Sequence, residues 1–216
     1  MIRSLIAFVL LLVMNLPAFA ADWKVEPAGE LKADAVAEAV RGVMEPKGLR
    51  VTDPAGKLLC ELWLRRDAAM NGAEVDGALF AKLQDGSLLG VIHFPADTSD
   101  YRGQGIKSGW YTLRYAVMPV NGSHQGVSPT RDFFLLCPVS EDKDPNKQIT
   151  GEALMKLSTG ASGSGHVSPW SLTSAPKDGL PKIETTEENH VILEVALNTK
   201  SGPLPIGITL VGKTEG

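Results

Sequence analysis

IKSGWYTLRYAV, at residues 106–117, is the strongest β-strand signal in the chain, because aromatic and β-branched side chains fill it. A polar loop over residues 119–130 follows, and DFFLLC at residues 132–137 returns as a second strand. We expect the two strands to pair antiparallel, with Tyr115 opposite Phe133 and Leu113 opposite Leu135. This register predicts one buried face made by Tyr111, Leu113, Tyr115, Phe133, Leu135 and Cys137.

The rest of the chain also favours a mainly β fold. Val36, Val40 and Val43 recur at helical spacing and predict a helix over residues 33–44, which Pro46 ends. A second, short helix is expected over 150–157, and residues 161–188 are expected to be irregular. Further strands are expected at 49–52, 57–65, 79–83, 87–94, 190–197 and 206–211. Short strands joined by turns predict an antiparallel β-sandwich of immunoglobulin-like or prealbumin-like architecture, with one N-terminal helix and one short helix.

The first twenty residues have the pattern of a secretory signal peptide. Arg3 is followed by an apolar run over residues 5–14, and Ala18-Phe19-Ala20 matches a small-residue cleavage site. The apolar run is too short for a stable membrane anchor. We therefore expect residues 1–20 to be removed and residues 21–216 to form one exported β-sandwich domain, either periplasmic or extracellular.

The charge balance argues against nucleic acid as a partner. The chain has 21 Lys and Arg against 25 Asp and Glu, for a formal net charge of −4. Charges of both signs are interspersed along the sequence, and a nucleic-acid-binding protein usually shows a basic stripe. The expected partner is therefore a protein or a small molecule.

The two cysteines are expected on strand faces that point into a core. Alternation places Cys60 with Leu62 and Leu64, and Cys137 with Phe133 and Leu135. In an oxidising compartment Cys60 and Cys137 could form a disulfide. The alternative is a pair of buried, unpaired thiols, since free cysteine packs well as a small apolar side chain.

Two local resemblances accompany these patterns. Residues 106–114 are similar to a strand of prealbumin-like and carboxypeptidase-regulatory-like sandwiches, and residues 109–138 resemble a group of uncharacterised exported bacterial proteins. The second group has no known activity, so it implies no catalytic residues. Cys60, Trp63 and Cys137 invite comparison with immunoglobulin domains, but Leu135 stands where the corner tyrosine of that family belongs, so only the architecture is kept.

No stretch of the sequence carries a complete catalytic, cofactor or metal motif. A phosphate loop ending at Lys107-Ser108 lacks its glycine, and a serine-hydrolase elbow at 160–164 lacks its last one. The acidic loop that begins at Asp142 lacks the turn glycine and the final glutamate of a calcium loop. The four histidines lack the spacing that would bring two ligands onto one element. We therefore predict no cofactor, no metal site and no catalytic residues.

The long loop between the two central strands is the candidate functional surface, because long loops on rigid sheets often carry function. The candidate ligand-binding residues are Arg114, Asn121, His124, Arg131 and Asp132. The competing interpretation is that Arg131 and Asp132 only brace the loop. The sequence thus favours an exported non-catalytic protein that binds an unidentified ligand or envelope partner. A hydrolase-type enzyme with a diffuse site near His124, or a structural envelope component, are the alternatives.

Overall fold

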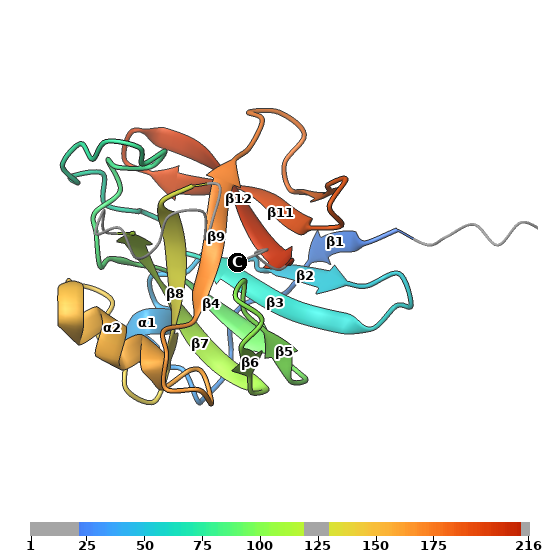
Figure 1. Ribbon diagram of the computed structural model, residues 1–216, viewed down its shortest axis with the longest axis horizontal. Coiled ribbons are helices and arrows are strands. Elements are labelled where there is room, and N and C mark those ends of the chain that lie inside the picture. Colours follow the sequence, from blue (N-terminus) through green and yellow to red (C-terminus); the bar gives the residue numbers. More distant parts are fainter. Residues whose placement is uncertain (1–21, 119–129, 213–216) are drawn as a thin grey trace, which may run out of the picture.

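Ten antiparallel strands form one continuous sheet in the computed structural model, which describes residues 22–118 and 130–212 (Figure 1). The strand order is β1-β2-β3-β4-β7-β8-β9-β12-β11-β10, and β5 and β6 form a separate two-stranded hairpin. The elements are β1 (Lys24–Pro27), α1 (Glu38–Arg41), β2 (Leu49–Thr52), β3 (Leu58–Leu64), β4 (Leu88–Phe94), β5 (Thr98–Ser99), β6 (Gly105–Ile106), β7 (Gly109–Val117), β8 (Asp132–Pro138), α2 (Gly151–Thr159), β9 (Pro169–Ser174), β10 (Lys182–Thr185), β11 (Val191–Thr199) and β12 (Gly202–Val211).

The sheet curls into a nearly closed, barrel-like form, so the mainly β, antiparallel prediction is confirmed, whereas a two-sheet sandwich is not clearly present. The edge strands β1 and β10 contact each other, although they are far apart in the sequence. One continuous apolar cluster fills the inside, with side chains such as Leu62, Ile92, Leu113, Trp170 and Leu193. Sequence periodicity cannot separate the two architectures, because strands of both alternate buried and outward side chains.

The central strands β7 and β8 pair as expected, but one residue out of the expected register. Tyr115 lies opposite Phe134, and Leu113 lies opposite Leu136. Because alternate residues point to opposite faces, this single shift exchanges the two faces of β8. Phe134 and Leu136 face the barrel interior. Leu135 and Cys137, predicted on that face, lie on the outer face beneath α2.

The register shift also separates the two cysteines. Cys60 belongs to the barrel interior, whereas Cys137 belongs to the outer cluster with Leu135 and Leu154. Both thiols are buried and free. The shared face expected for a disulfide is therefore wrong, and the structure contains the alternative arrangement of two unpaired thiols.

Two segments cover the outer face of the sheet. Helix α2 packs against β8, as expected of the second helix, although it extends to Thr159. The N-terminal segment lies over β3 and β4, where Val36, Val40 and Met44 pack with Trp63 and Val91. The helix predicted over residues 33–44 contracts to α1 because the chain turns repeatedly to follow this face, and Arg41 donates hydrogen bonds to the carbonyls of Ala33 and Val36 in this turn.

Three other local predictions change. Residues 79–83 form a turn and no strand, because the backbone N–H groups of Leu79 and Phe80 donate to the Asp132 carboxylate. The segment 161–188, expected to be irregular, contains β9 and β10. The last strand, expected at 206–211, begins earlier, at Gly202.

Candidate functional site

The structure does not bring the five predicted ligand-binding residues together. Asn121 and His124 lie outside the described residues. Arg114 and Asp132 are completely buried and serve opposite sides of the sheet. Arg114 points outward toward the loop after β8, whereas Asp132 binds Tyr115, whose side chain lies in the barrel interior.

Arg131 and Asp132 hold backbone segments in place, as the bracing interpretation requires. The Asp132 carboxylate accepts hydrogen bonds from the backbone N–H groups of Leu79 and Phe80 and from the Tyr115 hydroxyl at 2.7 Å. The Arg131 guanidinium donates to the carbonyls of Met118 and Asp76. These two side chains therefore tie β8 to the 76–80 turn, and their hydrogen bonds go to protein groups.

Arg114 is the centre of a buried polar network. Its Nε and Nη2 donate to the two carboxylate oxygens of Asp142 at 2.7 and 2.6 Å, and the Thr112 hydroxyl donates to the same carboxylate. Its Nη1 donates to the carbonyls of Gly86, at 2.6 Å, and Lys147, at 2.7 Å. One nitrogen thus joins the turn before β4 to the segment before α2.

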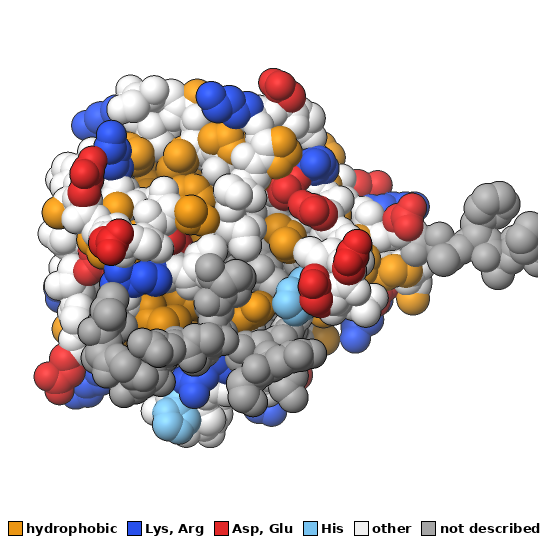
Figure 2. All heavy atoms as spheres, turned by 45° about the horizontal axis from the view of Figure 1, so that its top comes forward, with side chains coloured by type: hydrophobic (Ala, Val, Ile, Leu, Met, Phe, Trp, Pro, Cys, Tyr) orange, Lys and Arg blue, Asp and Glu red, His pale blue; other side chains and the backbone are white. Residues whose placement is uncertain are grey.

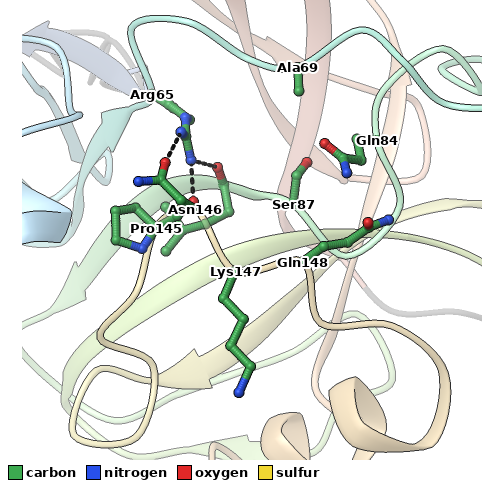
Figure 3. A pocket seen from close by; sticks show the side chains of 9 residues that line it. Arg65, Ala69, Gln84, Ser87, Pro145, Asn146, Lys147 and Gln148 are labelled. Atoms are coloured by element: carbon green, nitrogen blue, oxygen red, sulfur yellow. Dashed lines mark hydrogen bonds between the residues drawn. The ribbon is translucent and has the colours of Figure 1, made fainter.

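Those two joined segments form the walls of a small polar cleft (Figure 3). The 84–87 turn makes one wall, residues 145–148 make the other, and the end of β3 with the chain that follows it closes the third side. Gly86 permits this close approach, because its φ is +74° and a Cβ there would lie 2.0 Å from the Ile149 carbonyl oxygen. The cavity has a volume of about 210 Å³ and is lined by Arg65, Ala69, Gln84, Ser87, Leu88, Pro145, Asn146, Lys147 and Gln148.

Ser87 places an unsatisfied hydroxyl in this cleft. The residue is 8% exposed, and its Oγ has no hydrogen-bond partner among the described residues. The backbone of Ser87 is fixed, since its N–H donates to the Gln84 carbonyl and its carbonyl accepts from Tyr115. The hydroxyl points between Ala69 and the amide of Gln84 (Figure 3). A buried hydroxyl without a partner is costly, so it calls for an explanation.

Arg65 brings a positive charge to the opposite side of the cleft. Its Nη1 donates to the carbonyls of Leu88 and Pro145, and its Nη2 donates to the Asn146 side-chain oxygen at 3.1 Å. Burial lowers the pKa of this guanidinium, and the charge of Asp67 opposes that shift. Its hydrogen bonds go only to neutral acceptors in the described part of the chain, and its Nε–H has no acceptor there.

The lining of the cleft offers several groups that can hydrogen-bond to a polar ligand. They are a hydroxyl, three side-chain amides, a guanidinium and an ammonium group. The Lys147 side chain extends away from Ser87 in Figure 3, and the Gln148 amide donates to the Asp85 carbonyl. No histidine or carboxylate lies among the residues that line it, so a Ser87 nucleophile would have no adjacent base of the usual kind.

The other hollows among the described residues have no buried, unpaired polar atom like the Ser87 hydroxyl in their lining. A larger one of about 580 Å³ follows the 74–82 turn, and another of about 220 Å³ lies between β3 and β11. Among the described residues, four further buried polar side-chain atoms lack a hydrogen bond, and they belong to His93, Ser168, Trp170 and Glu194. None of these residues lines a hollow named here, and the Glu194 carboxylate lies 2.9 Å from the Lys182 ammonium.

Among the described residues, the face drawn in Figure 2 shows no concentrated patch of one charge sign. Acidic and basic side chains are scattered over it, with apolar side chains between them. No helix among the described residues is long and apolar enough to cross a membrane.

Sequence reasoning missed the cleft because its residues have no shared motif. Ser87 reads as an ordinary strand residue, and Arg65 and Asn146 are separated by 81 positions. Of the three predicted site residues that the structure describes, only Arg114 bonds the cleft walls, through the carbonyls of Gly86 and Lys147, and it acts there as a positioning residue. Comparisons of the chain with protein-family models, with curated proteins and with solved structures gave no match.

Proposed function

We propose that this protein is an exported, non-catalytic binding protein that holds a small polar ligand in the cleft between the 84–87 turn and residues 145–148. The observation that carries the proposal is the buried Ser87 hydroxyl, which has no hydrogen-bond partner among the described residues and points between Ala69 and Gln84, two residues of the cleft lining. A ligand that accepted or donated a hydrogen bond there would repay the cost of burying this hydroxyl. The volume of about 210 Å³ suits a ligand of roughly ten non-hydrogen atoms or fewer, since a water molecule takes about 30 Å³.

The walls of the cleft support a preformed site. Arg114 bonds both walls through one nitrogen. Arg65 donates to the Leu88 carbonyl, next to the 84–87 turn, and to the Asn146 side chain on the opposite wall. Binding to such a site requires little ordering of the protein, which favours affinity for a small ligand. The hydrolase alternative would place its site near His124, which lies outside the described residues.

A screen of small polar molecules by saturation-transfer NMR tests the proposal. The library should hold neutral, anionic and cationic compounds of up to about ten non-hydrogen atoms. We expect at least one compound to bind the wild type and to lose that binding in Ser87→Ala. The matched control is Ser168→Ala, which removes the other buried serine hydroxyl without a partner, at a position outside the cleft. Binding that survives Ser87→Ala, or no binding at all, would overturn the proposal.

Export rests on the pattern of residues 1–20 and has its own test. N-terminal sequencing of protein recovered from outside the cytoplasm should begin at or near Ala21. Recovery of mature soluble protein that still begins with Met1 would contradict export.

A further inference from the structure

We infer that the ligand of the Ser87 cleft is a short organic anion, with its carboxylate at Arg65 and a polar group at Ser87 and Gln84. This inference rests on the proposed function and adds the chemical class of the ligand. It follows from the charges of the lining residues, from the donors that remain free, and from the positions of Arg65 and Gln84 on two sides of Ser87.

The charge of the lining is one-sided. Arg65 and Lys147 are cationic, and no Asp or Glu is among the lining residues. The buried Arg114 charge is already neutralised by Asp142. Arg65 makes no ion pair within the described part of the chain, in contrast to Arg50, whose guanidinium binds the Glu61 carboxylate at 2.7 Å. A half-buried guanidinium that has no carboxylate within ion-pair distance, with the Asp67 charge acting on it only from farther away, favours an anion as its ligand.

The hydrogen-bond donors also match an anion. The two Nη1 bonds and the Nη2 bond of Arg65 fix the orientation of its guanidinium and leave the Nε–H without an acceptor among the described residues. The Asn146 side-chain oxygen is occupied by Arg65, so its amide presents N–H donors to other groups. A carboxylate accepts from N–H donors only, and guanidinium groups bind it with favourable geometry.

The other end of the cleft favours a neutral polar group. Ser87 can donate or accept, and the Gln84 amide offers both kinds of atom. Ala69 and Pro145 add apolar groups to the lining. A short hydroxy acid has this distribution of charge, apolar carbon and hydroxyl. A phosphate or sulfate ion has charge alone and lacks the group that would satisfy Ser87.

Matched pairs of probes of nearly the same size, in which a neutral amide replaces the carboxylate, give the decisive test. The dissociation constants of L-lactate and lactamide, and of 3-hydroxybutyrate and 3-hydroxybutyramide, are compared by calorimetry on the wild-type protein. In at least one pair the anion should bind about tenfold or more tightly than the amide, since a charge-assisted bond is about twice as strong as a neutral one. Arg65→Gln should abolish the preference, and Arg65→Lys should retain part of it. Lys143→Gln, an equal charge change on an exposed residue outside the cleft, should leave it within about twofold.

The outcomes separate the two proposals. Ser87-dependent binding of the amides with no preference for the anions overturns the anionic ligand and leaves the binding cleft in place. A preference equally weakened by Lys143→Gln reports the net charge of the protein and also overturns the inference. If no probe or library compound binds in a Ser87-dependent way, both proposals fail. Because the comparison of anion and amide uses the wild-type protein, it does not depend on how Arg65→Gln folds.

Discussion

Arg114 and Asp142 form a bidentate ion pair that is fully buried against the outer face of the sheet, with Nε–Oδ2 and Nη2–Oδ1 distances of 2.7 and 2.6 Å. Desolvation of two charges is costly, and here the cost is offset by further bonds from Arg114 to Gly86, Asp144 and Lys147. The pair therefore contributes more to the position of the cleft walls than to net stability.

Removing one partner of the Arg114–Asp142 pair should strongly destabilise the folded protein. Asp142→Asn leaves a buried guanidinium without a counter-ion, and we expect a loss of about 3–5 kcal/mol in the free energy of unfolding, measured by urea denaturation. The double variant Arg114→Met/Asp142→Leu should recover much of that loss, because it leaves no buried charge. The control is Arg50→Ala, which breaks the exposed pair with Glu61 and should cost less than about 1 kcal/mol. An Asp142→Asn variant as stable as the wild type would show that the pair is not buried as described.

The hydrogen bond from Tyr115 to Asp132 should contribute about 1.5–3 kcal/mol, the usual range for a bond to a charged group. Tyr115→Phe removes the donor and leaves the ring in place, so urea denaturation should report that loss. Tyr111→Phe is the matched control, because its hydroxyl donates to the neutral Lys107 carbonyl. Tyr111→Phe should lower the free energy of unfolding by less, about 0.5–1.5 kcal/mol. Equal costs in the two variants would mean that the carboxylate adds nothing.

Alkaline pH should destabilise the fold through its tyrosines. Burial raises the pKa of Tyr101, Tyr111 and Tyr115 above the ordinary value near 10, and the Asp132 carboxylate adds to the shift of Tyr115. The folded state then keeps protons that the unfolded chain loses, so the free energy of unfolding falls as pH rises, from about pH 9 through the buried Cys60 and Cys137 thiols and above about 10 also through the tyrosines. Urea denaturation between pH 8 and 11 should show this decrease, and Tyr115→Phe should make it shallower. An increase in stability over this range would contradict the buried environment of these phenols.

Local patterns predicted the antiparallel strands because each depends on nearby residues. The hairpin of β2 and β3, the β7–β8 pair and the α2 helix lie close to their expected positions. Barrel closure could not be predicted, because it depends on contact between β1 and β10, which are about 160 positions apart. The strand β9 was missed because it follows a Gly- and Ser-rich stretch, although Trp170 and Leu172 alternate into the core.

The candidate site was harder to predict than the fold for a physical reason. Charged residues beside a long loop suggested ligand binding, but Arg114 and Asp132 are satisfied by carboxylate, hydroxyl and backbone groups of the protein. The signal that marks the cleft is the opposite one, a polar group that the protein leaves unsatisfied. Ser87 can be recognised in this way only when the positions of its neighbours are known.

The two cysteines should behave as buried thiols in the folded protein. Burial raises the pKa of Cys60 and of Cys137, so the reactive thiolate is scarce at neutral pH. A thiol reagent should label the native protein slowly, and both thiols should react once it is unfolded in urea without reductant. An intact mass two daltons lower than the reduced chain would show a disulfide and contradict the free thiols of the structure.

The register of β7 and β8 can be tested by the coupling of leucines across the strands. Leu113 lies opposite Leu136 in the barrel interior, whereas Leu135 lies on the outer face with Leu154. Each Leu→Ala change should cost about 2–5 kcal/mol, because all three side chains are buried. The double variant Leu113→Ala/Leu136→Ala should deviate from additivity by about 0.5 kcal/mol or more, because the two side chains share one face. Leu113→Ala/Leu135→Ala should be additive within about 0.5 kcal/mol, because its side chains point to opposite faces. The reverse result would restore the pairing of Leu113 with Leu135 and, with it, the shared face of Cys60 and Cys137.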